Sequence, residues 1–224
     1  IVGNGLIANL FRENDRENVV FFASGVSNSL ETDKSAFLRE ENLIRKTIKE
    51  NPNKIFIYFS TCSIYDSSKN GSSYVNHKLK MEQIVEELAN QFLILRVSNA
   101  VGKGGNPNLL MNYLVNAFHQ EKEITVHTLA TRNLIDADDV KNITLKFINE
   151  NSFNKIINVA YLENFSTIQI LEILEKHFNK TAKTSLVKSG QSYLISIPEA
   201  EAYFAENKLT EKKEYLLRII KRYY

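Results

Sequence analysis

Apolar residues along the chain fall into short runs that are separated by longer segments of helical period. The short runs are apolar at almost every position, which is typical of parallel strands that helices cover on both faces. They predict strands at residues 19–23, 55–59, 92–97 and 156–159. Helices are expected at residues 8–16, 32–50, 73–90, 108–120, 137–150, 166–178, 199–206 and 210–222. This alternation predicts an α/β fold with a doubly wound, mostly parallel sheet.

Composition and charge exclude several classes of protein. Of the 224 residues, 43% are apolar and 24% are charged, so the chain can bury a full core. The 28 basic and 26 acidic residues nearly cancel, which removes any global charge argument for nucleic acid or an anionic membrane. Cys62 is the single cysteine and the four histidines lack ligand spacing, so neither a disulfide framework nor a metal site is predicted. No apolar run reaches membrane-spanning length, and we expect a soluble, cytoplasmic protein without nucleic-acid or membrane partners.

A glycine-rich turn separates the first apolar residues from the first predicted helix. Residues 1–2 have the character of a strand end, and a G-x-G-x-x-A sequence follows over residues 3–8. The first glycine permits a tight turn, the second lets the backbone approach a pyrophosphate, and the alanine lets the helix pack closely. An ordinary tight turn has the same composition, but a strand before and a helix after form the context that a dinucleotide site requires. The candidate cofactor-binding residues of this turn are Gly3, Gly5, Leu6 and Ile7.

The adenosine half of such a site is incomplete in this sequence. Dinucleotide sites usually carry an acidic residue about 20 residues further on, at the end of the second strand, where it holds the adenosine ribose. The predicted strand at residues 19–23 ends instead in Ala23-Ser24-Gly25, which contains no acidic residue. The choice between NAD and NADP therefore stays open.

A tyrosine and a lysine stand four residues apart near the start of the helix predicted at residues 73–90. This spacing places Tyr74 and Lys78 on one helical face, one turn apart. An ammonium group beside a phenol stabilises the phenolate form and so assists proton exchange near neutral pH. The spacing also occurs by chance on surface helices. Thr61 favours the catalytic interpretation, because it follows the strand at residues 55–59 at the edge where doubly wound folds hold their sites.

The order of these motifs resembles that of the short-chain dehydrogenases/reductases. It is most similar to their extended branch, the nucleotide-sugar epimerases, dehydratases and 4-ketoreductases. The resemblance rests on the glycine turn, on the Ala-Ser-Gly strand end, and on Ser60-Thr61-x-x-x-Tyr65 and Tyr74-x-x-x-Lys78. Residues 95–102 and 132–140 extend it to about residue 160. The resemblance implies a Rossmann-type sheet, abbreviated because about ten residues separate the glycine turn from the next strand, so that the adenine-side strands are missing.

The resemblance also implies roles for individual residues. Tyr74 would act as general acid/base at a sugar oxygen, Lys78 would assist it and hold the nicotinamide ribose, and Thr61 would bind the same oxygen. Asn99 and Arg132 would bind the nucleotide sugar, and an arginine fork suits a diphosphate. A surface ion pair is the alternative for Arg132. Further cofactor contacts are implied for the strand end, at Ala23, Ser24 and Gly25, with NAD or NADP as cofactor.

One departure from the family narrows the reaction. Dehydratases of this branch carry an acidic pair directly after the active-site threonine, and this chain has Cys62-Ser63 there. Neither is a carboxylic acid, which disfavours dehydration and favours a 4-ketoreductase or 4-epimerase. The resemblance to the family implies a role in surface-polysaccharide assembly. A packing role is expected for Cys62 because no activating base is evident. A non-catalytic binding or regulatory module and a dinucleotide-binding redox sensor are the alternatives.

The segments are expected to divide between a core and a substrate-binding part. Residues 1–100, rejoined by about 137–160, would form the Rossmann-type core, and residues 101–136 and 161–224 a small α/β substrate subdomain. Within the latter, residues 193–198 resemble a short strand that ends at a proline. The basic amphipathic helix at residues 210–222 is expected to pack on the core with a solvated outer face, the alternative being a membrane-surface role. By resemblance to the family, the protein is expected to form a homodimer.

Overall fold

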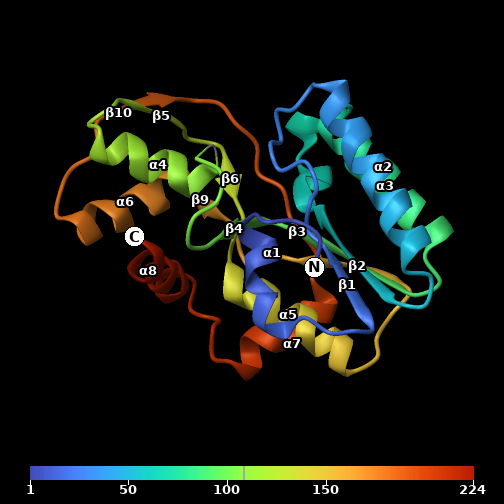
Figure 1. The fold of residues 1–224 in the computed structure, drawn as a ribbon. Helices are drawn as coiled ribbons and strands as arrows, with labels where there is room; N and C mark the ends of the chain where they lie inside the picture. Colours follow the sequence, from blue (N-terminus) through green and yellow to red (C-terminus); the bar gives the residue numbers. More distant parts are fainter. Residues whose placement is uncertain (108) are drawn as a thin grey trace.

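A four-stranded parallel sheet lies at the centre of the protein (Figure 1). The computed structural model describes residues 1–107 and 109–224. In spatial order, the strands are β1 (Val19–Phe22), β2 (Ile55–Thr61), β3 (Phe92–Val97) and β8 (Lys155–Val159). Beyond β1, Val2 adds one parallel bridge to Phe22. The four predicted strands and their parallel pairing are confirmed, and among the described residues this edge of the sheet holds nothing beyond the bridge at Val2.

Both faces of the sheet are buried, which explains why its strands are apolar at nearly every position. Successive residues point to opposite faces. Phe22 and Tyr58 belong to the core on one face, and Phe21 and Ile57 to the core on the other. Figure 1 shows that α2 (Lys34–Glu50) and α3 (Ser73–Leu88) lie over the first face. The helices α1 (Leu6–Leu10), α5 (Ala137–Asn149) and α7 (Pro198–Glu206) lie over the second face.

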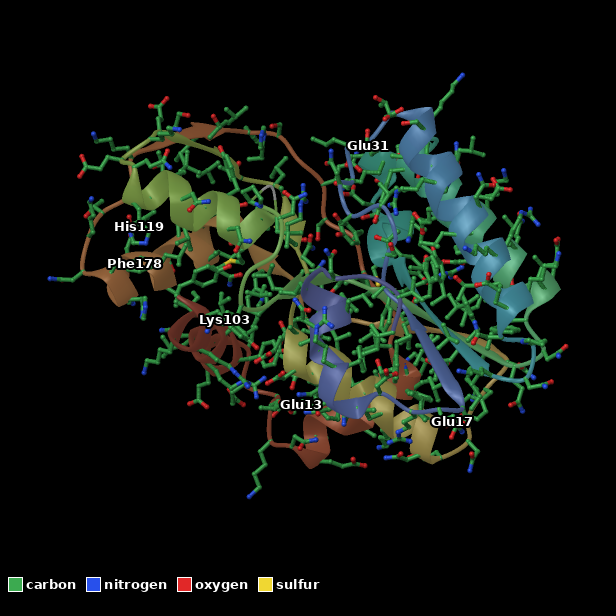
Figure 2. All side chains as sticks on the ribbon, viewed as in Figure 1. Glu13, Glu17, Glu31, Lys103, His119 and Phe178 are labelled. Carbon is green, nitrogen blue, oxygen red and sulfur yellow. The ribbon has the colours of Figure 1, made fainter. Side chains whose placement is uncertain are left out.

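The remaining elements form small sheets and helices beside the carboxyl ends of the central strands (Figure 1). The strand pairs are β4 (Asn99–Val101) with β7 (Leu134–Asp136), β5 (Ile124–His127) with β10 (Thr184–Val187), and β6 (Thr131–Arg132) with β9 (Phe165–Ser166). The helices are α4 (Leu110–His119), α6 (Thr167–Phe178) and α8 (Lys212–Tyr223). His119 and Phe178, labelled in Figure 2, join α4 to α6 through an edge-to-face contact of 4.7 Å between ring centroids. The division into a core and a substrate subdomain stays a prediction.

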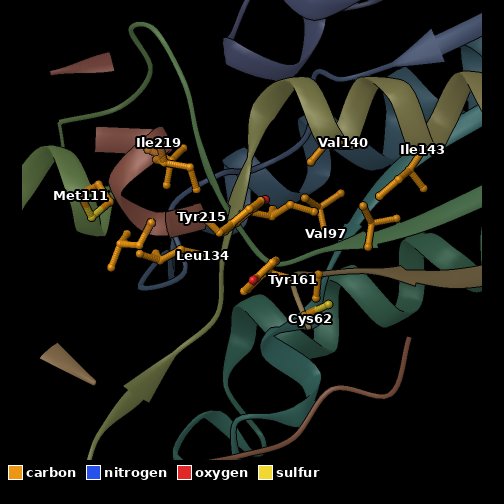
Figure 3. Packing of buried hydrophobic residues seen from close by; sticks show 14 of the residues in the cluster. Cys62, Val97, Met111, Leu134, Val140, Ile143, Tyr161, Tyr215 and Ile219 are labelled. Atoms are coloured by element: carbon orange, nitrogen blue, oxygen red, sulfur yellow. The ribbon is translucent and has the colours of Figure 1, made fainter. Parts of the chain in front are cut away.

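Helix α8 is anchored to the core by aromatic and charged contacts. The rings of Tyr161 and Tyr215 stack at 3.7 Å between centroids (Figure 3). Asp139 accepts hydrogen bonds from the Tyr203 hydroxyl (2.8 Å) and the Tyr215 hydroxyl (2.7 Å), and it pairs with Arg218. The expected packing of residues 210–222 on the core is thereby confirmed. Within the described residues, none of the helices is long and apolar enough to cross a membrane.

Most of the predicted helices are confirmed, with ends that differ by at most two residues. The helix predicted at residues 8–16 is wrong in extent, because the chain forms the shorter helix α1, which starts at Leu6 and ends at Leu10, and then a single 3-10 turn (Arg12–Asn14). Residue 108 of the helix predicted at 108–120 lies outside the described residues. The strand predicted at residues 193–198 is wrong. Pro198 begins α7, and the backbone before it bonds to side-chain amides, since Asn158 donates to the Ser196 carbonyl (2.8 Å) and Asn164 to the Tyr193 carbonyl. These amides replace the strand partner that the pattern alone suggested.

Candidate active site

A cavity of about 1040 Å³ opens at the carboxyl ends of β1, β2 and β3. Parallel strands gather loop residues at this edge, which is where doubly wound folds bind their ligands. The predicted site residues that line the cavity are Gly5, Leu6, Ile7, Ala23, Ser24, Gly25, Thr61, Tyr74, Lys78 and Asn99. Gly3 and Arg132 are not among the residues that line it. Segments that are far apart in the sequence therefore converge at one site.

The two glycines of the N-terminal turn differ in their surroundings. Gly3 has a φ angle of +122°, and a Cβ atom added to it would lie 2.5 Å from the Ala23 carbonyl oxygen. A Cβ atom on Gly5 would meet nothing within 4 Å. Gly3 is thus required for the packing of the turn against the end of β1, whereas the open space at Gly5 belongs to the cavity.

Tyr74 and Lys78 occupy the first turns of α3, which Ser72 caps through its side chain. Both side chains are buried, with 6% and 2% of their surfaces exposed, and both line the cavity. The Lys78 ammonium donates to Glu40 Oε1 and to the Phe59 carbonyl oxygen, each at 3.1 Å. An ammonium has three protons to donate, so one remains for a ligand in the cavity.

Glu40 is the centre of a buried hydrogen-bond network behind the cavity wall. Its Oε1 also accepts from the Tyr58 hydroxyl (2.7 Å). Its Oε2 accepts from the Val26 N–H (2.7 Å) and lies 3.0 Å from His77 Nε2. Burial alone would raise the pKa of Glu40, but the Lys78 charge and these hydrogen bonds hold it well below the ordinary value of 4.5. The carboxylate is therefore ionised although its residue is 0% exposed.

Thr61 and Cys62, at the end of β2, have different roles. The Thr61 Oγ1 accepts a hydrogen bond from the Ser63 N–H (3.0 Å), and no acceptor for its hydroxyl proton is found among the described residues, so it can donate into the cavity. The Cys62 thiol donates to the Arg96 carbonyl oxygen (2.9 Å) and is 2% exposed. Burial raises the pKa of Cys62 to about 12. It is a thiol at neutral pH and packs in the core, as the sequence predicted.

The two residues assigned to the nucleotide sugar lie in different positions. Asn99 lines the cavity, and its amide group donates to the Asn133 carbonyl oxygen (2.7 Å), so its own Oδ1 can accept from a ligand. Arg132 donates a hydrogen bond to the Thr131 carbonyl oxygen (2.8 Å) and does not line the cavity. It acts electrostatically on Lys69, which does line the cavity and whose pKa is lowered by burial and by Arg132.

The aspartates near residue 137 have a structural role. Asp136 caps α5 by accepting from the Asp138 N–H (2.9 Å), whereas Asp139 bonds to α7 and α8. Burial raises the pKa of Asp139, and its hydrogen bond from Tyr215 and the charge of Arg218 oppose that effect. In the part of the chain that the structure describes, no group of three or more His, Cys, Asp or Glu residues is arranged to hold a metal ion.

Several residues of the site were not predicted from the sequence. Glu40 has a detectable signal, because it shares the buried face of α2 with Ile44 and Ile48 at helical spacing. Arg39, whose guanidinium donates to the Ser24 carbonyl oxygen (3.2 Å), and Tyr193 line the cavity without any sequence motif. They are brought there by the tertiary fold, which local spacing does not encode.

Comparisons with known proteins place these observations in context. A sequence model of the NAD dependent epimerase/dehydratase family matches residues 3–160. No curated protein matches the chain significantly. Among solved structures, the chain is similar to UDP-glucuronic acid 4-epimerase from Bacillus cereus in complex with UDP-glucuronic acid and NAD, with a TM-score of 0.69 and 19% identity over 95% of this chain and 78% of that one.

Two further structures extend this similarity. dTDP-glucose 4,6-dehydratase from Bacillus anthracis in complex with NAD has a TM-score of 0.67 and 16% identity, over 97% of this chain and 78% of that chain. RMD from Pseudomonas aeruginosa complexed with NADPH has a TM-score of 0.69 and 13% identity, over 92% and 80%. At these identities the likeness shows the fold, and it confirms the predicted Rossmann-type architecture.

Proposed function

Because the chain belongs to the NAD-dependent epimerase/dehydratase family, we propose that it oxidises or reduces a nucleotide-activated sugar with NAD(P), as a 4-epimerase or 4-ketoreductase. The observation that carries this proposal is the convergence of Tyr74, Lys78 and Thr61 on one cavity with the glycine turn. These residues supply an acid/base, a cation and a hydroxyl donor at the edge of the sheet where a ligand is expected. The structural neighbours described above hold UDP-glucuronic acid, NAD or NADPH, which supports this choice of ligands.

The residues of the cavity fit two parts of a nicotinamide dinucleotide, the pyrophosphate and the nicotinamide ribose. The open space at Gly5 suits a pyrophosphate that approaches the backbone, and the free ammonium proton of Lys78 suits a ribose hydroxyl. The third part is the adenosine: the described part of the sheet stops at the bridge of Val2, and Ser24 and Arg39 are among the polar residues that line the cavity beyond β1. When bound, the dinucleotide would accept or return a hydride at a sugar carbon.

Side chains of the protein transfer the proton of the sugar hydroxyl and orient its oxygen. Tyr74 takes the proton of a sugar hydroxyl when that carbon is oxidised and returns it when the ketone is reduced. Thr61 donates its free hydroxyl proton to the same oxygen and orients it. Cys62 stands where a dehydratase would need an acid, and its raised pKa makes it unsuited to expel a hydroxyl group. The proposed reaction is therefore the interconversion of a sugar hydroxyl and a ketone, without loss of water.

Titration calorimetry tests this proposal directly. The purified protein is titrated with NADH and with NADPH, each with and without a UDP- or dTDP-sugar. Micromolar binding of one dinucleotide is expected, and it also decides between NAD and NADP. Subsequent incubation with the oxidised cofactor and a panel of nucleotide sugars, analysed by NMR, separates epimerase from ketoreductase activity.

One observation favours a second function, a binding or regulatory module without turnover. The short sheet edge at Val2 offers no acidic partner for an adenosine ribose among the described residues. Binding of a nucleotide sugar without any dinucleotide would favour that module. Tight dinucleotide binding without a nucleotide sugar would instead indicate a redox sensor.

A further inference from the structure

Glu40 is buried on α2 and bonds to groups from three other segments. Its partners belong to the loop after β1 (Val26), to β2 (Tyr58) and to α3 (His77 and Lys78). Every one of these contacts is 3.1 Å or shorter. A carboxylate that accepts from so many buried donors holds their side chains in one arrangement.

The charge of Lys78 depends on this carboxylate. Lys78 is 2% exposed, and a buried ammonium is strongly unfavourable unless a counter-charge compensates it. Glu40 is the only carboxylate within 4.0 Å of Lys78 Nζ among the described residues. The Phe59 carbonyl oxygen and the face of the Tyr58 ring, 4.5 Å from Nζ, add weaker attraction.

Gly25 shows independently that the chain is built around this ion pair. A Cβ atom added at Gly25 would lie 2.8 Å from Glu40 Oε1 and 2.9 Å from Lys78 Nζ. The backbone of the loop after β1 therefore passes directly over the pair, and Gly25 also lines the cavity. The absence of a side chain at this position leaves room for the pair at the cavity wall.

We infer that Glu40 is a positioning residue that fixes the Lys78 ammonium at the wall of the cavity, with one proton directed to the ligand. The inference deepens the proposed function and rests on it for the catalytic consequence. Glu40 touches no substrate itself, because it does not line the cavity and acts through Lys78. Without the carboxylate, the ammonium would turn toward other acceptors and lose its fixed direction.

The first test observes Lys78 directly and requires neither substrate nor cofactor. In protein with ¹⁵N-labelled lysine side chains, a slowly exchanging ammonium signal is expected and is assigned by its loss in Lys78→Met. Glu40→Gln should abolish or strongly shift this signal. Glu41→Gln is the matched control, because Glu41 pairs with Lys80 (2.6 Å) between the same two helices, and Lys80 is 56% exposed. An unchanged Lys78 signal in Glu40→Gln would overturn the inference.

The second test measures the catalytic consequence. In Glu40→Gln, kcat should fall about 10-fold or more while KM for the nucleotide sugar changes less than about 3-fold, since the acid/base geometry is lost and sugar contacts remain. Glu40→Asp keeps the charge and should recover part of kcat, and Glu41→Gln should match the wild type. In a Lys78→Met background, Glu40→Gln should cause no further loss of kcat. Independent, additive losses would contradict a role through Lys78.

The two proposals fail in different ways. A wild-type protein that turns over no nucleotide sugar would refute the proposed function, and the ammonium spectrum would still decide whether Glu40 fixes Lys78. If Glu40→Gln does not fold, Glu40→Gln/Lys78→Met is expected to fold, because the unpaired buried ammonium is gone. A double variant as unstable as the single variant would overturn the inference.

Discussion

The Tyr74 side chain is buried, yet its hydroxyl group is left for a ligand. It is 6% exposed and lines the cavity, and no hydrogen-bond partner is found for its hydroxyl among the described residues. Tyr65 differs, because its hydroxyl lies 2.9 Å from Nδ2 of Asn158, a residue of β8. The Tyr74 hydroxyl is therefore available to a ligand, as the proposed acid/base role requires, whereas the Tyr65 hydroxyl bonds within the protein.

This contrast predicts opposite effects for two similar substitutions. Tyr74→Phe is expected to lower turnover by at least about 100-fold, because the acid/base is removed, with little change in thermal stability. Tyr65→Phe is expected to cost about 1 kcal/mol of stability, from the lost hydrogen bond, and to keep turnover. Steady-state kinetics and thermal denaturation of both variants check this. Undiminished turnover in Tyr74→Phe would refute its assignment as acid/base.

At the level of elements, the two glycines of the N-terminal turn, Gly3 and Gly5, are constrained by different surroundings. Gly3 is constrained by its positive φ and by the backbone of Ala23, and Gly5 is constrained only by what enters the cavity. Gly3 is therefore required for the packing of the turn, and Gly5 is the position at which we expect a ligand to approach the backbone.

Substitution by alanine should separate these requirements. Gly3→Ala is expected to destabilise the protein by roughly 1–3 kcal/mol, because the backbone must shift and adopt a strained conformation. Gly5→Ala is expected to leave the unfolding midpoint in urea nearly unchanged and to weaken dinucleotide binding. Urea denaturation and calorimetry of the two variants provide the measurement, and equal effects on stability would contradict the distinction.

The elements that sequence patterns predicted well are those whose burial is regular. The four central strands are apolar on both faces, and residues such as Phe22 and Ile57 therefore reveal them directly. The segment before Pro198 was mispredicted because Asn158 and Asn164, distant in sequence, satisfy its backbone. The spacing of α2 could reveal that Glu40 is buried, but not what it bonds to, because its partners belong to three segments that only the tertiary fold brings together.

At the level of the whole molecule, buried charges make stability depend on pH. The pKa of Glu40 is held below its ordinary value of 4.5 in the folded state, so the unfolded chain binds more protons as the pH falls below about 4.5. The stability that Glu40 contributes is therefore present above this pH and is lost progressively below it. The raised pKa of Asp139 acts with the opposite sign.

A comparison of two proteins isolates the contribution of Glu40. The unfolding free energies of the wild type and Glu40→Gln, measured by urea denaturation between pH 7 and pH 3, should differ most near neutral pH and converge as the pH falls. Asp139 is common to both proteins, so its effect cancels in the difference. A constant difference across this range would show that the Glu40 charge does not contribute.

The outer face of α2 and α3 is where we expect a second copy to bind. The two helices lie side by side over one face of the sheet (Figure 1), and Leu38 of α2 and Leu88 of α3 are 57% and 44% exposed. Sedimentation velocity at micromolar concentration should show a homodimer, and Leu38→Lys should shift it toward monomer. A monomeric wild type would remove this prediction.

The contacts of Asp139 also order events during synthesis. Its partners Tyr215 and Arg218 follow it by 76 and 79 residues. On a ribosome that adds about 5–20 residues per second, Arg218 is joined to the chain roughly 4–16 s after Asp139. The strands of the central sheet are complete before then, but the carboxylate at the start of α5 has no counter-charge. We therefore expect this corner of the nascent protein to stay open to chaperones until α8 has left the exit tunnel.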